Sequence, residues 1–348
     1  MRNWAILFLA AALQLSCFPS VKAEEIPELQ AKSAAVTSRD GQLLYGLEPD
    51  LMLPIASTTK LMTALVVIEN CDLDQPVEIQ PAWCGAEGSS MYLKPGESYS
   101  VRELLTGLLL VSGNDAAVAL AEFCGGSQDA FAAMMNAKAK SLGMRNTHYL
   151  NPHGLNEAGH YSTARDLAIL MCACMENPAF AETIRLRNAE VGGQTLINHN
   201  KLLSGYSGCI GGKTGYTKVA GRCLVSCVER EGTRFVCVTL SDPDDWNDHI
   251  KLFDWAFSHF EERVFGAEEL QYQVPVLGGS EENVLAVPFE PLHLLVPKDQ
   301  ELKVCAELPF FVFAPVLEGD EAGRLTLYLQ DQPLAETTLS YGGSVPVK

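Results

Sequence analysis

Positive charge is scarce in this chain of 348 residues. Lysine and arginine number 25 against 43 aspartates and glutamates, which gives a net charge of −18 at pH 7. A protein that binds nucleic acid or an anionic surface through its bulk charge carries the opposite balance. The composition therefore argues against nucleic-acid binding and otherwise favours solubility.

The sequence also lacks internal repeats, low-complexity segments and a four-ligand metal pattern. Two close cysteine pairs have no histidine pair that would complete a zinc site: Cys172 with Cys174, and Cys223 with Cys227. Three histidines lie in one polar, turn-rich segment: His148, His153 and His160. No acidic cluster accompanies them, so we expect hydrogen bonds within a loop, no metal and no other cofactor.

The state of the cysteines is open at the level of sequence. Of the 11 cysteines, all but Cys17 lie beyond residue 23. An even number of cysteines in an exported protein is compatible with disulfides. Most of them, however, lie in apolar runs such as Cys223-Leu224-Val225-Ser226-Cys227, which favours buried free thiols.

The apolar stretch near the N-terminus, residues 4–15, is too short to span a membrane comfortably. It follows Arg2 and precedes Val21-Lys22-Ala23, which is the order of a signal peptide with a small-x-small cleavage site. We therefore expect residues 1–23 to be a signal peptide and the protein to be exported. Cys17 offers lipid attachment as an alternative, although Gln14 stands where a lipoprotein signal usually has an aliphatic residue.

One tetrapeptide, Ser57-Thr58-Thr59-Lys60, comes directly before the apolar residues 61–68. The apolar run predicts a buried helix that starts near Ser57, and residues three apart on a helix share a face. The Ser57 hydroxyl and the Lys60 amine can therefore meet. A serine needs a base to become a nucleophile, and a lysine is a base when a dry site or a nearby cation keeps its amine neutral.

Two further short motifs follow: Ser112-Gly113-Asn114 and Lys213-Thr214-Gly215. Each has a local explanation, because serine, glycine and asparagine favour turns and the second motif can end a strand. A chance combination of all three motifs in this order is rare. Together they form a candidate catalytic site.

With these motifs the chain resembles the penicillin-recognising serine acyltransferases. Within them it is similar to the serine D-alanyl-D-alanine carboxypeptidases, the low-molecular-weight penicillin-binding proteins. Further stretches carry this narrower resemblance: Ser89-Ser90-Met91-Tyr92-Leu93-Lys94-Pro95-Gly96, Asp115-Ala116, Asn146-Thr147-His148, His153-Gly154-Leu155 and Tyr161-Ser162-Thr163-Ala164-Arg165-Asp166-Leu167-Ala168.

The resemblance implies an α/β (α+β) fold, with an antiparallel sheet flanked by helices and an all-helical lobe. This catalytic domain is expected at residues 24–266. Residues 267–348 alternate in short apolar runs without helix signals, which predicts a small β-rich domain. An amphipathic helix is expected at residues 245–262, and a hairpin is expected around Asp40-Gly41.

The activity implied by the resemblance is that of a serine-type D-Ala-D-Ala carboxypeptidase. Such an enzyme removes the terminal D-Ala from peptidoglycan stem pentapeptides through an acyl-enzyme on Ser57, and β-lactams such as penicillins inhibit it covalently. The implied catalytic residues are Ser57 as nucleophile, Lys60 as base, Ser112 as proton relay, Asn114 as a contact to substrate and Lys60, and Lys213 as a positive charge that keeps Lys60 neutral. The implied substrate-binding residues are Thr214, Gly215, Tyr216 and His199, with the N–H groups of Ser57 and Tyr216 as the oxyanion hole.

Three positions depart from the family pattern or have two interpretations. Tyr216 stands where relatives often have histidine, and we expect an altered rate because only its N–H is needed. His199 stands where relatives often carry arginine or threonine, and it would bind a carboxylate only when protonated. Asp166 is either an acidic residue of an Ω-like loop or a helix cap.

Two rival functions are weaker. A class A β-lactamase carries a Glu-x-x-Leu-Asn loop, whereas residues 146–170 contain only Glu157. A non-catalytic wall-binding protein would have no need of intact Ser57, Lys60 and Lys213. Relatives usually carry a C-terminal amphipathic helix at the membrane surface; no such pattern precedes Lys348, so membrane association through the C-terminus is not expected.

Overall fold

The computed structural model describes residues 27–348, so the expected signal peptide at residues 1–23 lies outside the described residues. The described chain forms two compact units, and the division falls between Ser258 and His259. Each unit has its own hydrophobic core.

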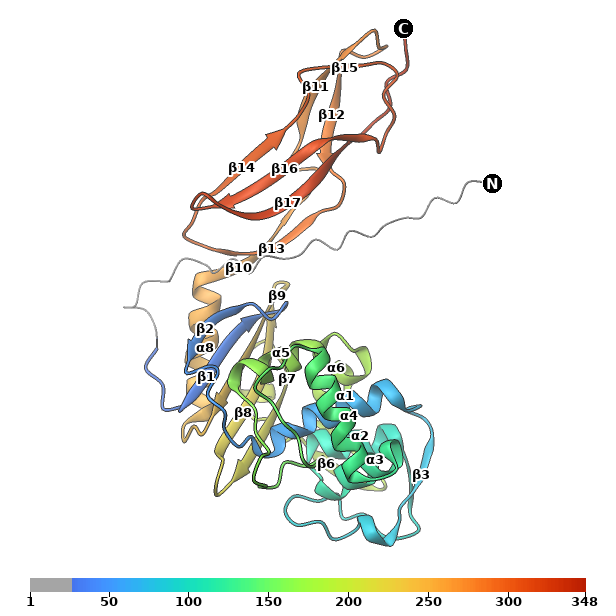
Figure 1. Cartoon of the computed structure of the whole chain (residues 1–348), viewed down its shortest axis with the longest axis vertical. Helices are drawn as coiled ribbons and strands as arrows, with labels where there is room; N and C mark the ends of the chain where they lie inside the picture. The colour runs from blue at the N-terminus through green and yellow to red at the C-terminus, as the bar shows by residue number, and fades with distance from the viewer. Residues whose placement is uncertain (1–26) are drawn as a thin grey trace. The chain divides into compact units, whose positions relative to one another are not determined.

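A five-stranded antiparallel sheet is the centre of the N-terminal unit (Figure 1), with the strand order β2-β1-β9-β8-β7. Its strands are β1 (Ser33–Ser38), β2 (Leu43–Leu47), β7 (Cys209–Thr217), β8 (Gly221–Arg230) and β9 (Thr233–Leu240). Strands β1 and β2 form the hairpin that Asp40-Gly41 predicts. The motif Lys213-Thr214-Gly215 lies in β7, at one edge of this sheet.

Helices cover both faces of the sheet, because successive side chains of a strand point to opposite sides. On one face, Ser226 Oγ in β8 lies 2.6 Å from Nδ1 of His249 in α8 (Asp245–His259). On the other face, Thr37 Oγ1 in β1 lies 3.6 Å from Sγ of Cys172 in α5 (Ala164–Met175). The predicted sheet flanked by helices is confirmed.

The rest of this unit is a mainly helical lobe that carries the other two motifs. Its helices are α1 (Lys60–Asn70), α2 (Val101–Leu110), α3 (Asn114–Gly125), α4 (Gln128–Ser141), α6 (Pro178–Ile184) and α7 (Leu202–Gly205), with the short turns η2 (Ala56–Thr59) and η3 (Pro81–Trp83). Two small hairpins accompany them: β3 (Pro76–Glu78) with β4 (Ser98–Ser100), and β5 (Asn188–Val191) with β6 (Gln194–Ile197). Within residues 27–348, no single helix has the length and hydropathy to cross a membrane, and α5 with α6 qualifies only as a pair bent by 106°.

Local sequence signals set several helix ends. The Ser100 side chain accepts a hydrogen bond from the Glu103 N–H, and the Glu103 carboxylate accepts one from the Ser100 N–H, which starts α2 with a capping box. The helix expected at residues 245–262 ends at His259, because Phe260 begins a strand that pairs with residues 292–297. The sequence pattern could not show this partner strand, which lies far along the chain.

The C-terminal unit contains no helix from Phe260 onward, as the alternating runs predict. Its six-stranded sheet has the order β14-β16-β17-β12-β11-β15, and β10 pairs with β13 separately. The strands are β10 (Phe260–Phe265), β11 (Tyr272–Leu277), β12 (Asn283–Pro288), β13 (Leu292–Pro297), β14 (Leu302–Glu307), β15 (Val312–Phe313), β16 (Glu321–Leu329) and β17 (Gln332–Tyr341). Leu325, Leu327 and Leu339 are fully buried in its core.

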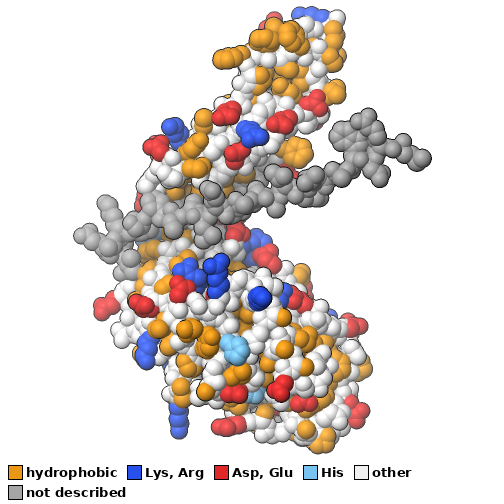
Figure 2. Space-filling view, in the orientation of Figure 1, with side chains coloured by type: hydrophobic (Ala, Val, Ile, Leu, Met, Phe, Trp, Pro, Cys, Tyr) orange, Lys and Arg blue, Asp and Glu red, His pale blue; other side chains and the backbone are white. Residues whose placement is uncertain are grey.

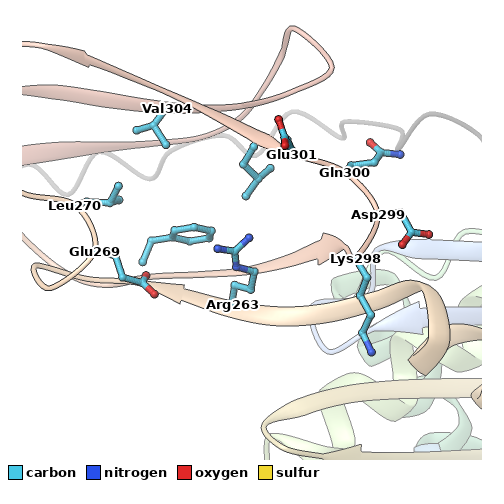
Figure 3. A pocket seen from close by; sticks show the side chains of 10 residues that line it. Arg263, Glu269, Leu270, Lys298, Asp299, Gln300, Glu301 and Val304 are labelled. Carbon is cyan, nitrogen blue, oxygen red and sulfur yellow. The ribbon is translucent and has the colours of Figure 1, made fainter.

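A surface pocket of about 660 Å³ opens in the C-terminal unit (Figure 3). Arg263 and Lys298 lie in its wall together with the acidic Glu269 and Glu301, over apolar residues such as Val304. The pocket mixes both signs of charge. All of its lining residues belong to the C-terminal unit, whereas the three sequence motifs lie in the N-terminal unit.

The molecular surface carries charged side chains of both signs and a hydrophobic region. Figure 2 shows lysine and arginine side chains interspersed with acidic ones on the face in view, and hydrophobic side chains gathered at the end of the C-terminal unit that carries β15. At that end Phe310 is 97% exposed.

All ten cysteines among residues 27–348 are free thiols.

One prediction concerns the C-terminal sheet, where β16 has a register irregularity between Glu321 and Gly323. A Cβ on Gly323 would lie 2.1 Å from the carbonyl oxygen of Glu307. We expect Gly323→Ala to lower the free energy of unfolding by about 1–3 kcal/mol, because the backbone must shift to accept the methyl group. Thermal unfolding measures the loss, with Gly343→Ala as the matched control, since a Cβ there has no neighbour within 4 Å. Equal melting temperatures of the two variants would contradict the prediction.

Candidate active site

Ser57 lies in η2, a short 3₁₀ turn directly before α1. The sequence pattern placed this serine at the helix start, and the structure places it in the turn that precedes the helix. Ala56 has a φ of +47°, a left-handed conformation that residues with a Cβ seldom adopt. The turn leaves Ser57 partly exposed, while Ala56, Thr58 and Thr59 are buried.

Lys60 is fully buried and its amine has three partners. Its Nζ lies 3.0 Å from Ser57 Oγ, 2.6 Å from Asn114 Oδ1 and 2.8 Å from the His153 carbonyl oxygen. A neutral amine has two N–H donors and one lone pair. The two carbonyl oxygens can take the two N–H groups, which leaves the lone pair to accept a hydrogen bond from the Ser57 hydroxyl.

Burial is the main reason why the pKa of Lys60 lies well below its ordinary value. The charge of Lys213 lowers this pKa further, and Asp115 opposes the shift. The sequence predicts two causes of a neutral Lys60 amine, a dry site and a nearby cation. In the structure burial is the larger cause, because removing an ammonium group from water costs more than a nearby cation adds.

Asn114 and Asp115 begin helix α3 and hold the loop of residues 87–93 against it. The Asn114 N–H donates to the Ser89 carbonyl oxygen at 2.7 Å, and Asn114 Nδ2 donates to the Glu87 carbonyl oxygen. The fully buried Asp115 carboxylate accepts four hydrogen bonds at 2.6–3.1 Å, from Ser90 Oγ and from the N–H groups of Met91, Leu93 and Ala116. Asn114 is thereby fixed with its Oδ1 toward Lys60.

Ser112 combines two costly features. Its φ is +62°, and its buried Oγ has no hydrogen-bond partner within residues 27–348. Strained residues and unsatisfied buried polar groups are rare and concentrate at functional sites. Ser112 is separated from Asn114 by one residue, so its hydroxyl belongs to the same end of α3.

Lys213 is 1% exposed, and its Nζ donates to the Thr214 carbonyl oxygen at 2.9 Å. Burial lowers the pKa of Lys213 to about 7. Gly215 explains how β7 approaches the nucleophile turn, because a Cβ there would lie 3.0 Å from the Ser57 nitrogen. The Tyr216 side chain is 67% exposed beside this close approach.

His199 lies near these groups without contacting Lys60. Its N–H donates to the Leu110 carbonyl oxygen at 3.2 Å, at the end of the helix that precedes Ser112. Partial burial of the ring and the charge of Lys213 lower the pKa of His199 below its ordinary value. The lowered pKa disfavours the protonated imidazole that a carboxylate would require.

Asp166 and two of the histidines organise loops. Thr163 is the N-cap of α5 and accepts a hydrogen bond from the Asp166 N–H, while the buried Asp166 carboxylate accepts hydrogen bonds from the Asn146 N–H at 2.8 Å and from Thr147 Oγ1 at 2.7 Å. Nδ1 of His148 lies 2.8 Å from the Gly159 carbonyl oxygen, and Nδ1 of His153 accepts from the Leu155 N–H. Within residues 27–348, no group of three or more histidine, cysteine or acidic side chains is arranged to hold a metal ion.

Sequence reasoning missed three contributors to the site: the carboxylate of Asp115 and the carbonyl oxygens of Glu87 and His153. The carboxylate has a sequence signal, because an acidic residue in the first turn of a helix is typical, but that signal does not reveal the loop it holds. The two carbonyl oxygens have no signal, since every residue type carries the same group.

Comparison with known proteins now places the chain. A family model described as D-alanyl-D-alanine carboxypeptidase matches residues 20–244. The chain belongs to this family. It is a serine-type D-Ala-D-Ala carboxypeptidase, as the three motifs predict, and residues 261–347 match the model for the C-terminal domain of penicillin-binding protein 5.

Named relatives and solved structures agree with this assignment. The carboxypeptidase DacF of Bacillus subtilis is 33% identical over 329 residues, which are 89% of this chain and 85% of that protein. DacB2 of Mycobacterium tuberculosis is 42% identical over 67% of this chain and 84% of its own length. The structure of penicillin-binding protein 5 from Haemophilus influenzae superimposes with a TM-score of 0.74 at 28% identity, covering 92% of this chain and 99% of that one.

The carboxylate of Asp115 gives a prediction for this carboxypeptidase. The Asp115 carboxylate accepts hydrogen bonds from buried donors. An asparagine side chain would place an NH₂ group, which is itself a donor, beside some of them. We expect Asp115→Asn to lower the free energy of unfolding by about 3 kcal/mol, because buried donors lose their acceptor. Denaturant unfolding measures the change. Asp129→Asn is the matched control, since Asp129 lies in the first turn of α4 and is exposed; equal losses in the two variants would contradict the prediction.

Proposed function

We propose that this carboxypeptidase is exported and removes the terminal D-Ala from peptidoglycan stem pentapeptides through an acyl-enzyme on Ser57, and that penicillins block it by acylating the same serine. The observation that carries the proposal is the hydrogen-bond set of the buried Lys60 amine. Its two N–H groups donate to the carbonyl oxygens of Asn114 and His153, so its lone pair is directed at Ser57 Oγ, 3.0 Å away.

Acylation begins when Ser57 Oγ attacks the carbonyl carbon of the penultimate D-Ala and the Ser57 proton passes to Lys60 Nζ. The substrate oxygen becomes negatively charged and accepts hydrogen bonds from the N–H groups of Ser57 and Tyr216. The close approach of Gly215 to the Ser57 nitrogen supports this pairing, because it brings β7 beside the nucleophile turn.

The bond from the penultimate carbonyl carbon to the terminal D-Ala nitrogen then breaks, and that nitrogen needs a proton. Ser112 Oγ, buried and without a partner within residues 27–348, can pass the proton from Lys60 to the departing amine. Water afterwards attacks the ester on Ser57 and gives a proton to the neutral Lys60. Lys60 returns this proton to Ser57 Oγ as the ester bond breaks, which releases the shortened peptide and regenerates the free serine. An acyl group derived from penicillin stays on the serine.

Recognition of the terminal carboxylate falls to Lys213 and Thr214. Within residues 27–348 the Lys213 ammonium donates to one acceptor, the Thr214 carbonyl oxygen, so it has donors left for a carboxylate. Asn114 offers its side-chain amide to the peptide groups of the substrate.

The β-lactamase alternative gains no support, because the carboxylate of Glu157 accepts a hydrogen bond from Asn151 Nδ2 within its own loop.

Export is supported by the sequence of residues 1–23, with its charged start, short apolar stretch and small residues at the cleavage site. The substrate is then the stem peptide of peptidoglycan on the outer side of the cytoplasmic membrane. Fractionation of cells that produce the full chain tests this part of the proposal.

The activity is tested with Ser57→Ala. We expect the wild-type protein to shorten stem pentapeptides by one D-Ala in isolated muropeptides and the variant to leave them intact, because the variant lacks the hydroxyl that forms the ester. Mass spectrometry of the muropeptides measures the change, and a fluorescent penicillin labels only the wild type. Equal D-Ala release by both proteins would sink the proposal.

The pKa of Lys213 gives a pH prediction. Because this pKa is about 7, Lys213 is charged below that pH and neutral above it, so we expect kcat/KM for a peptide ending in a free carboxylate to fall as the pH rises above about 7. This parameter reports the ionisations of the free enzyme. Lys213→Arg keeps its charge and should remove the fall. A wild-type profile that stays flat to alkaline pH would contradict the prediction, and the same peptide with a C-terminal amide is the control.

A further inference from the structure

His160 is a buried imidazole beside the nucleophile turn, and the proposed reaction gives it no role. It is 6% exposed, and its ring meets that of Tyr149 edge to face, with centroids 5.7 Å apart. Burial, with a smaller contribution from His148, lowers the pKa of His160 to about 4. The ring is therefore neutral at pH 7 and carries one N–H.

The two ring nitrogens of His160 have different partners, which determine where that proton lies. The Leu150 N–H donates to Nδ1 at 3.1 Å, so Nδ1 is an acceptor. In a neutral imidazole the proton is then on Nε2. Nε2 lies 2.8 Å from Thr59 Oγ1, and His160 therefore donates to Thr59.

Thr59 links His160 to the peptide group that joins Ala56 to Ser57. Its Oγ1 accepts from His160 and donates its own proton to the Ala56 carbonyl oxygen at 2.9 Å. The Ala56 carbonyl and the Ser57 N–H belong to one planar peptide group. Fixing the direction of the carbonyl therefore fixes the direction of the Ser57 N–H.

This peptide needs support from outside the turn. Ala56 has a φ of +47°, and such a conformation persists when the surroundings over-determine it. Gly154 supports the same carbonyl, since a Cβ on Gly154 would lie 1.9 Å from the Ala56 oxygen and 2.8 Å from Thr59 Oγ1. The loop of residues 148–160 thus reaches the Ala56–Ser57 peptide both directly and through His160.

We propose that His160 is a positioning residue: it acts through Thr59 to hold the Ala56–Ser57 peptide so that the Ser57 N–H faces the oxyanion. The inference rests on the proposed function, because it requires this N–H to be an oxyanion donor. His160 itself contacts neither the substrate nor Lys60.

Four single variants separate the links of this chain. Glutamine at position 160 can place an N–H near the position of Nε2, whereas asparagine reaches only as far as Nδ1. Thr59→Val removes the hydroxyl with little change in shape, and Thr59→Ser retains it. Thr58→Val is the matched control, because the buried Thr58 hydroxyl also donates to a carbonyl oxygen in this turn, that of Ile55.

We expect His160→Asn and Thr59→Val to lower kcat on an acyl-D-Ala-D-Ala peptide by roughly 10- to 100-fold with KM unchanged, since loss of a whole oxyanion donor costs about 100- to 1000-fold. His160→Gln and Thr59→Ser should restore most of the rate, and Thr58→Val should cost far less than Thr59→Val. The double variant of Thr59→Val and His160→Asn should be no slower than Thr59→Val alone, because both changes break one chain.

Thermal unfolding of every variant separates positioning from folding. Unchanged kcat in His160→Asn and Thr59→Val, losses that multiply in the double variant, or losses that follow the melting temperature across all variants would each overturn the positioning role. If the His160 variants do not fold, the comparison of Thr59→Val with Thr59→Ser and Thr58→Val decides. A wild-type protein that releases no D-Ala contradicts the proposed function, and the inference falls with it; an active wild type with unaffected variants contradicts the inference alone.

Discussion

The removal of two lysine amines from water is the constraint on which the rest of the catalytic unit depends. Lys60 and Lys213 are 0% and 1% exposed, and a buried ammonium is costly unless it is paired or loses its proton. Lys60 forms no hydrogen bond to a carboxylate within residues 27–348, and its two carbonyl acceptors suit a neutral amine. In the described part of the chain Lys213 has a single hydrogen-bond acceptor, the Thr214 carbonyl oxygen, and its pKa is about 7. A substrate carboxylate would pair with the Lys213 ammonium. Substrate binding is therefore coupled to the protonation of Lys213.

Asp115, an acidic residue whose charge acts on Lys60, has a structural role. Asp115 raises the pKa of Lys60 and so works against a neutral base. Its carboxylate, however, accepts four hydrogen bonds from residues 90–93 and from the start of α3. Those bonds spread its charge and fix the loop on which Asn114 depends. The site tolerates an unfavourable electrostatic effect on the base because the same carboxylate holds Asn114 in place.

The sequence predicts those parts of the site that depend on spacing along one element. The three-residue separation of Ser57 and Lys60 places both on one face, and Ser100 with Glu103 determines where α2 begins. It does not reveal contacts that use backbone atoms, such as the His153 carbonyl at Lys60, or partners far along the chain, such as the strand that ends α8 at His259. The left-handed backbone of Ser112 is equally hidden, because serine carries no signal for a positive φ.

The segment of residues 146–160 shows why such hidden contacts matter. Its sequence is polar and irregular, and its histidines suggest either a metal or simple loop hydrogen bonds. In the structure the loop contacts the base and the nucleophile turn: the His153 carbonyl accepts from Lys60, and the His160 ring donates to Thr59. The loop is held in turn by Asp166 at its start and by Asn151, whose Oδ1 accepts from the Gly154 N–H at 2.7 Å. One segment therefore contacts the base directly and the nucleophile turn through Thr59, although neither contact has a signal in the sequence.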